Sequence, residues 1–158
     1  MNVSLTQKET MLLQDQKSHE ELCIEKYTEY ANKASDPQLK QIFTSNANQE
    51  KQHLDSINQL LNGQLPDLNA QGGQQANNQP MEQNQNMQEA GMSAASDVQM
   101  CEDILMTEKY VSSAYDTSIF EFRDTNIRDV LNHIQKEEQK HGESVYQYME
   151  SKGMYNPQ

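Results

Sequence analysis

The stretch EKQHLDSINQLL, residues 50–61, places a glutamate and a histidine three residues apart on a helix face that should be buried. Ile57 and Leu60 give that face its apolar character. The same arrangement returns in EQKHGESVYQYM, residues 138–149. A carboxylate or an imidazole in a protein core costs several kcal/mol unless it is paired. Two such pairs in one chain therefore call for a function.

Both stretches belong to an internal repeat. A shift of 88 residues aligns the two halves of the chain without a gap. The aligned pairs are Asp15/Asp103, Glu20/Glu108, Tyr27/Tyr115, Asp36/Asp124, Glu50/Glu138, His53/His141, Ser56/Ser144 and Gln59/Gln147. We therefore expect two structurally related halves.

The first half is expected to form a helical hairpin over residues 4–62. Its apolar residues recur every three or four positions, as on one face of a helix. Ser4 and Gln7 fit a capping box at the start of the hairpin. Asp36 followed by Pro37 supplies an N-cap and a first-turn proline, which predicts a tight turn there.

The second half is expected to form a matching hairpin over residues 96–152. Ser96 and Gln99 again fit a capping box, and Asp124 or Thr125 caps the helix that follows the turn. No segment alternates polar and apolar residues as a strand does. The pattern predicts an all-α four-helix bundle.

Residues 63–95 differ in composition from both hairpins. They are rich in Gln, Asn and Gly, and large aliphatic side chains are almost absent after Leu68. Such a segment buries too little surface to offset its ordering entropy, so we expect a mobile connector. Residues 1–158 are then one domain of two hairpins and a connector.

The four repeated glutamates are expected to lie at one level of the bundle. Glu20 precedes the turn residue Asp36 by 16 positions and Glu50 follows it by 14, so the two stand level in an antiparallel hairpin. Glu108 and Glu138 have the same spacing about their own turn.

The histidines His53 and His141 lie one helical turn beyond the second glutamate of each hairpin, on the same face. Packing the two hairpins face to face gathers four carboxylates and two imidazoles. Four buried carboxylates repel one another, and two divalent cations neutralise them. One Glu from each of two helices, with Glu-x-x-His from each of the others, is the ligand set of di-iron and di-manganese bundles. Zinc also fits these donors. The alternative is a set of core polar groups hydrogen-bonded to one another.

Two tyrosines, Tyr27 and Tyr115, lie two turns after Glu20 and Glu108. Two roles stay open for them. One is core packing with the hydroxyl bonded to a carbonyl or carboxylate. The other is a hydrogen bond to a metal ligand.

The acidic composition excludes several partners. With 12 Lys+Arg against 24 Asp+Glu, the net charge is −12, which argues against nucleic acid and anionic membranes. No apolar run is long enough to span a bilayer, and the N-terminal residues do not resemble a secretory signal. Cys23 and Cys101 are too few for a disulfide scaffold, so two reduced thiols are expected, with a single bridge as the alternative.

At these motifs the chain resembles ferritin-like four-helix bundles, and more closely the spore coat F protein family of endospore-forming bacteria. The resemblance rests on SHEELCIEKYTEYANKASDPQLKQIF, residues 18–43, and on the segment from EKYVSSAYDTSIFEF to YQYMESKGMY, residues 108–155. It implies a ferritin-like topology, in which the second and third helices run parallel and the connector crosses over along the bundle. It also implies two iron or manganese ions held by Glu20, Glu50, His53, Glu108, Glu138 and His141.

The resemblance leaves two functions open. One is a spore coat protein whose di-metal site acts on peroxide or oxygen. The absence of a Cys-x-x-Cys pair argues against a rubrerythrin-type peroxidase. The other is a structural coat component, with a structural or vestigial metal site. Either implies synthesis in the cytoplasm of the sporulating cell, location in the spore coat, and contact with other coat proteins and with copies of itself.

Overall fold

A computed structural model of the chain describes residues 3–68 and 90–155. The described residues form four long helices. They are α1 (Gln7–Lys33), α2 (Pro37–Leu61), α4 (Ala90–Glu121) and α5 (Thr125–Ser151).

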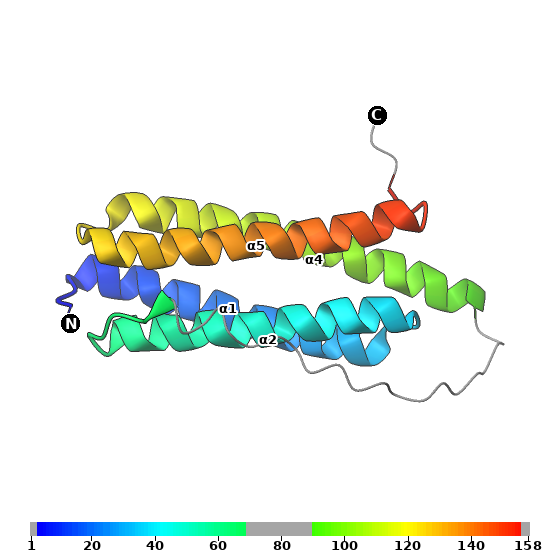
Figure 1. Ribbon diagram of the computed structural model, residues 1–158, viewed down its shortest axis with the longest axis horizontal. Coiled ribbons are helices and arrows are strands. Elements are labelled where there is room, and N and C mark those ends of the chain that lie inside the picture. Colours follow the sequence, from blue (N-terminus) through cyan, green and yellow to red (C-terminus); the bar gives the residue numbers. More distant parts are fainter. Residues whose placement is uncertain (1–2, 69–89, 156–158) are drawn as a thin grey trace.

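The four helices form a bundle of two antiparallel hairpins, α1–α2 and α4–α5 (Figure 1). Helix α1 also packs on α4, and α2 packs on α5. Helices α2 and α4 run in the same direction, so α2 ends at the opposite end of the bundle from the start of α4 (Figure 1). The predicted all-α bundle of two hairpins is confirmed, and its helix directions are those that a crossover connection requires.

The predicted start of the first helix is wrong: the capping box is formed by Thr6 and Glu9 and not by Ser4 and Gln7. Thr6 is the N-cap, in place of Ser4, and its hydroxyl accepts the N–H of Glu9 at 3.2 Å. The Glu9 carboxylate in turn accepts the N–H of Thr6 at 2.7 Å. A carboxylate at this position interacts favourably with the positive end of the helix dipole, which the neutral Gln7 does not.

The predicted start of the third helix is also wrong. Helix α4 begins at Ala90, so Ser96 and Gln99 lie inside it rather than in a cap. The sequence AGMSAA at 90–95 contains three alanines and a methionine, which have high helix propensity and favour extension toward the N-terminus. Residues 69–89, the rest of the predicted connector after Leu68, lie outside the described residues.

Both hairpin turns have the predicted aspartate caps. Asp36 accepts the N–H of Gln38, and Asp124 accepts the N–H of Asn126, each at 2.8 Å. Asp124, rather than Thr125, is therefore the N-cap of α5. Helix α2 ends at Leu61 with Asn62 as its C-cap, and Gly63 follows in a left-handed conformation (φ 74°), which glycine adopts without the steric penalty of a Cβ.

Each turn is also bound by a buried acid from the other hairpin. Asp97 of α4 accepts the N–H of Ser35 at 2.9 Å and that of Asp36 at 3.1 Å. Glu9 of α1 accepts the N–H of Arg123 at 3.1 Å and its guanidinium at 3.3 Å. Glu9 and Asp97 occupy equivalent positions of the repeat. These reciprocal contacts fix how far one hairpin can slide along the other.

Replacement of Glu9 by Gln is expected to destabilise the bundle by about 1–3 kcal/mol at pH 7, the usual cost of losing hydrogen bonds to a buried charge. Burial raises the pKa of Glu9, but hydrogen bonds from Thr6 and Arg123 outweigh it and lower the pKa to about 2. A lowered pKa stabilises the fold above the ordinary carboxyl pKa of about 4.5, and this contribution disappears as the pH falls towards 2. Urea unfolding at pH 7 and pH 3 measures the effect.

The matched control for this prediction is Glu121→Gln. Glu121 forms an exposed ion pair with Lys8 at 2.5 Å, and such surface pairs contribute about 0–1 kcal/mol. A difference between wild type and Glu9→Gln that is unchanged at pH 3 would contradict the prediction.

Two apolar clusters fill the bundle on either side of its centre. One contains Leu13, Ile57, Leu60, Val111, Phe122, Ile127, Val130, Leu131 and Ile134, together with Cys23 and Tyr115. The other contains Tyr27, Leu39, Phe43, Ile104, Val145, Tyr148 and Met149, with small residues and Met100 between them. In residues 3–68 and 90–155, no helix is long and apolar enough to cross a membrane.

Candidate metal centre

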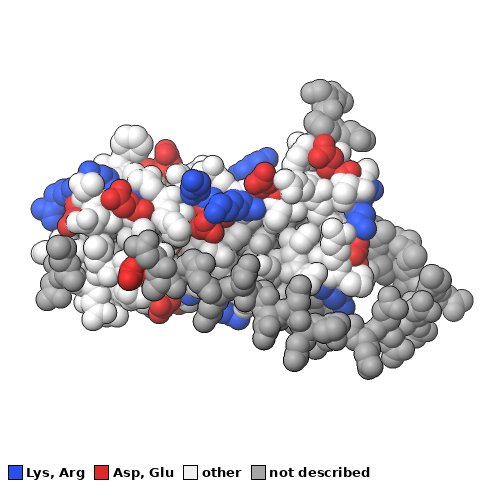
Figure 2. Space-filling view, viewed as in Figure 1, with Lys and Arg blue, Asp and Glu red and all other residues white. Residues whose placement is uncertain are grey.

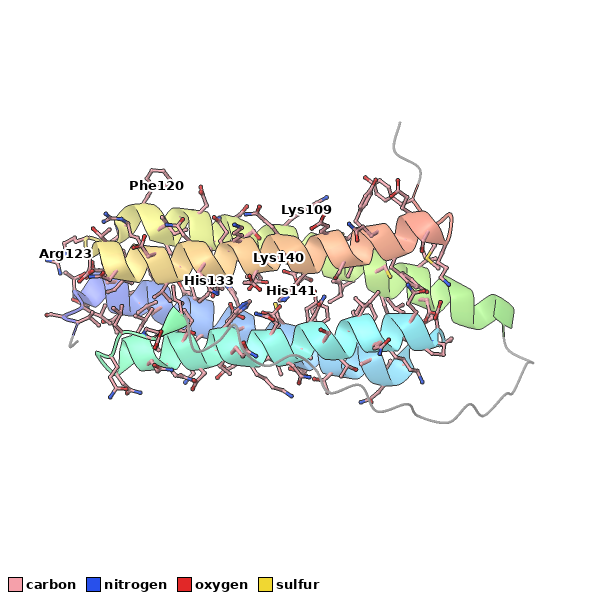
Figure 3. All side chains as sticks on the ribbon, viewed as in Figure 1. Lys109, Phe120, Arg123, His133, Lys140 and His141 are labelled. Carbon is pink, nitrogen blue, oxygen red and sulfur yellow. The ribbon has the colours of Figure 1, made fainter. Side chains whose placement is uncertain are left out.

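All six predicted metal ligands lie together at the centre of the bundle, between the two apolar clusters. Helix α1 supplies Glu20, α2 supplies Glu50 and His53, α4 supplies Glu108, and α5 supplies Glu138 and His141. Each of these side chains is buried, with at most 4% of the residue exposed. Figure 3 shows His141 directed from α5 toward α2, inside the bundle.

The first group of ligand atoms surrounds His53. Its Nδ1 atom lies 3.1 Å from Glu50 Oε2, 3.1 Å from Glu138 Oε1 and 3.7 Å from Glu20 Oε2. These residues come from α1, α2 and α5. One nitrogen therefore faces three carboxylates from three different helices.

The second group surrounds His141 in the same way. Its Nδ1 atom lies 3.2 Å from Glu50 Oε1, 3.3 Å from Glu138 Oε2 and 3.5 Å from Glu108 Oε1. The rings of His53 and His141 stack, with centroids 5.6 Å apart and planes inclined by 28°. The two groups are thus neighbours.

Two carboxylates are common to both groups. Glu50 and Glu138 each place one oxygen beside His53 and the other beside His141. Glu20 belongs only to the first group, and Glu108 only to the second, and we call these two the terminal carboxylates. The arrangement is two four-residue groups joined by two bridging carboxylates.

The spacing within each group fits a shared cation. Oxygen and nitrogen ligands lie about 2.0–2.2 Å from iron-sized or zinc-sized ions, so two ligands of one ion are about 3–3.5 Å apart. The Nδ1–oxygen distances of 3.1–3.7 Å are close to this range. A single Nδ1–H donates well to one acceptor at a time, so hydrogen bonding alone does not explain three carboxylates around each imidazole.

Several polar atoms of the centre have no hydrogen-bond partner in the described protein. They are Glu20 Oε2, Glu108 Oε2, Glu138 Oε2, His53 Nε2 and His141 Nε2. Each unsatisfied buried group costs about 1–3 kcal/mol. The three oxygens therefore favour a cation as their partner. The two Nε2 atoms lack the carboxylate or carbonyl that usually orients a metal-bound histidine.

Without a cation, the surroundings of Glu20 and Glu108 favour the protonated form of each carboxyl by raising its pKa. Burial raises the pKa of Glu20 well above its usual range, and the charge of Glu138 raises it further. Burial likewise raises the pKa of Glu108, with the charges of Glu138 and Glu50 adding to the effect.

The pKa values of the two histidines are also raised, whereas those of the bridging carboxylates are lowered. Burial lowers the pKa of His53 and His141, but bonds to the surrounding carboxylates outweigh it and raise both values well above the ordinary one. Burial also raises the pKa of Glu50 and Glu138, but bonds from the two histidines lower both overall. The raised pKa values favour protons on Glu20, Glu108 and the two histidines, and two divalent cations would balance the four carboxylate charges in their place.

Comparison with protein families finds a match for the second half of the chain. The family model of the Coat F domain matches residues 96–158. The matched segment, which we call the Coat F domain, includes α5 and the part of α4 from Ser96 onward. This match confirms the predicted resemblance to the spore coat F family over the second half of the chain. Comparison with curated proteins and with solved structures gave no match.

The Coat F domain supplies half of the candidate centre: Glu108, Glu138 and His141 lie within the match. The other three residues lie in the first hairpin, at the equivalent positions of the repeat. Because Glu50 and Glu138 belong to both groups, neither four-residue group is complete within one hairpin. The site requires the Coat F domain and the first hairpin to pack together.

The two tyrosines cross between the hairpins. Tyr27 of α1 donates its hydroxyl to Glu108 of the Coat F domain, and Tyr115 of the Coat F domain donates to Glu20 of α1. Both tyrosines are fully buried. Of the two roles left open by the sequence, the structure shows a hydrogen bond to a predicted ligand, combined with core packing. Each tyrosine fixes the orientation of one terminal carboxylate.

Proposed function

We propose that this chain is a spore coat protein and that it binds two divalent metal ions, iron or manganese, at the centre of its bundle. The observation that carries the proposal is the pair of bridging carboxylates: Glu50 and Glu138 each present one oxygen to the first group and the other oxygen to the second. Four carboxylates with two imidazoles suit iron or manganese, and zinc fits the same donors.

Each residue of the centre has a defined role in this proposal. Glu50 and Glu138 would hold both ions. Glu20 and His53 would complete the first site, and Glu108 and His141 would complete the second. Tyr27 and Tyr115 orient the terminal carboxylates through hydrogen bonds. The apolar clusters on both sides exclude water and so strengthen the electrostatic interactions within the centre.

Two iron or manganese ions held in this way supply two-electron chemistry on the O–O bond of peroxide or oxygen. The proposed activity is turnover of peroxide or oxidation of ferrous iron. The residues of this chain would contribute by holding the ligands in place. The hydroxyl groups of Tyr27 and Tyr115 would also keep their protons directed at the terminal carboxylates.

Metal content of the purified protein, measured by mass spectrometry, tests the binding proposal. Two ions per chain are expected in the wild type, one for each group, and none in a Glu50→Ala/Glu138→Ala variant. The matched control is Gln49→Ala/Glu137→Ala. These residues immediately precede the bridging glutamates and bond to each other at 3.0 Å, outside the groups. A folded wild type that takes up neither iron nor manganese would refute the proposal.

A structural role in the coat is the second candidate, and the Coat F match favours it independently of any chemistry. Here the metal would hold the two hairpins together, and the protein would associate with coat proteins and with itself. Light scattering of the metal-loaded protein tests self-association. Metal-loaded protein that turns over no peroxide and oxidises no ferrous iron would leave this candidate in place of the enzyme.

A further inference from the structure

The two halves of the centre differ in their access to the surface. Glu20 and His53 are 0% and 1% exposed, whereas Glu108 and His141 are 3% and 4% exposed. A surface groove of about 1240 Å³ lies between α4 and α5, and its lining includes Glu108 and Glu138. The groove therefore reaches carboxylates of the second group from outside the bundle.

The repeat shows why the groove lies on this side. At three equivalent positions, apolar residues of the first hairpin are replaced by smaller or polar ones. The pairs are Ile24/Ser112, Ala47/Gln135 and Leu54/Gly142. All three second-hairpin residues line the groove. A Cβ added at Gly142 would meet no atom within 4 Å, so the space that a side chain such as Leu54 would occupy is open.

The groove is polar along its wall, and charged side chains of both signs line it: Lys109, Lys136 and Lys140 beside Asp116 and Glu143. Gln135 donates its side-chain amide to the carbonyl of Ser112 at 2.8 Å, across from α5 to α4. Lys109 and Lys140 line the groove from the two helices, as Figure 3 shows. Figure 2 shows basic and acidic side chains interspersed on the face of the bundle that it presents. In a chain with net charge −12, these lysines reduce the repulsion that a small anion would meet.

We propose that the groove between α4 and α5 admits a small polar molecule, of the size of peroxide or azide, to the His141 side of the centre, and that Gly142 keeps this route open. The proposal rests on the proposed metal function. It assigns the ligand-accessible position to the second ion, held by Glu108 and His141. The first ion, beside Glu20 and His53, is enclosed.

The opening itself is tested in the metal-free protein with a pair of cysteine variants, Ser112→Cys and Ile24→Cys. These positions are equivalent in the repeat and both are half-buried. Iodoacetamide is expected to alkylate the thiol at position 112 about tenfold faster than that at position 24, because reaction requires access. The native thiols Cys23 and Cys101 are buried, which raises the pKa of both and keeps them unreactive.

Adding Gly142→Leu to the Ser112→Cys variant is expected to reduce its alkylation rate toward that of Ile24→Cys. Leucine at position 142 copies Leu54 and enters open space, and it has higher helix propensity than glycine, so the variant is expected to fold. Equal alkylation rates at positions 112 and 24 would overturn the proposal.

The route to the metal is tested with Co²⁺-loaded protein and azide, followed by the visible absorption of the cobalt. Gly142→Leu is expected to weaken or slow azide binding by about tenfold while cobalt content stays at the wild-type level. Gly142→Ala, which removes the glycine but leaves most of the space, is expected to bind azide as the wild type does. Unchanged azide binding in Gly142→Leu would overturn the route.

A wild type that takes up no Co²⁺ would overturn the metal function and this route with it. The alkylation rates distinguish that failure from the absence of an opening, because they are measured without metal. Rapid alkylation at position 112 with no cobalt uptake places the failure in the metal proposal. Slow alkylation with normal cobalt uptake places it in the groove.

Discussion

Single alanine substitutions of the four central glutamates are expected to remove one metal ion or both, depending on which carboxylate is lost. Glu50→Ala and Glu138→Ala should each abolish binding of both ions, because each carboxylate has one oxygen in each group. Glu20→Ala and Glu108→Ala should each leave one ion bound, because each belongs to a single group. The expected stoichiometries are therefore zero and one.

Two physical effects support this division. Loss of a bridging carboxylate removes a ligand from both ions and leaves them less well shielded from each other's charge. Loss of a terminal carboxylate removes one ligand and one charge near a single ion, while the other group keeps all four of its residues. The corresponding tyrosine also loses its acceptor, Tyr115 in Glu20→Ala and Tyr27 in Glu108→Ala.

Anaerobic titration with Fe²⁺ or Mn²⁺, followed by mass spectrometry of the bound metal, measures the stoichiometry. Circular dichroism confirms that each variant is folded, and Gln49→Ala/Glu137→Ala again serves as the control. Loss of both ions in all four variants would show that the two sites form only together. Retention of both ions in Glu50→Ala or Glu138→Ala would contradict the bridging arrangement.

The position of the centre was predictable from the sequence because helices are regular. Glu20 and Glu50 are placed by counting residues from Asp36, and the count holds for any pair of helices that turn tightly at a capped proline. The repeat then places Glu108 and Glu138 at the same level of the second hairpin. Counting residues does not give the rotation of one hairpin relative to the other. The sequence therefore did not predict that Glu50 and Glu138 are shared between the two groups.

The helix starts were less predictable because local signals compete. Ser4 and Thr6 both head a capping-box pattern, and only the second has a carboxylate at the third helical position. Glu9 is also held by Arg123, a contact between residues more than one hundred positions apart. A signal for this contact was present in the repeat, which pairs Glu9 with Asp97, another acid that binds the turn of the opposite hairpin.

The groove illustrates a different limit. Residues that are identical in the two halves of the repeat predicted the centre. Access to the centre depends instead on positions at which the two halves have different residues. Leu54 and Gly142 are equivalent in sequence, yet only packing shows that the space beside Gly142 remains open. A helical glycine is usually a cost of about 1 kcal/mol, so its presence one residue after His141 was the available signal.

Removal of the bound ions is expected to lower the stability of the bundle, and to lower it more at pH 8 than at pH 6. A ligand present at about 100 times its Kd stabilises the folded state by about 2.7 kcal/mol per site. Two sites would then account for a drop of roughly 10–20 °C in Tm for a chain of this size. Differential scanning calorimetry, with and without a chelator, measures the change.

The pH dependence follows from protons that replace the metal. The pKa values of His53 and His141 are raised in the metal-free fold, so their stabilising contribution is complete below the unfolded value near 6.5. It is lost as the pH rises toward the folded values. The raised pKa values of Glu20 and Glu108 act in the same direction, from about 4.5 upward. The lowered pKa values of Glu50 and Glu138 favour the fold above 4.5 and add no further change between pH 6 and pH 8.

The metal-free protein should therefore lose stability between pH 6 and pH 8, over the same interval in which metal binding strengthens because fewer protons compete for the ligands. The chelator-induced drop in Tm should widen across this interval in the wild type. In Glu50→Ala/Glu138→Ala, which has no site to empty, the chelator should leave Tm unchanged at every pH. A wild-type Tm that is the same with and without chelator would contradict this prediction, because the hairpins would then be held together by their protein contacts without a contribution from metal.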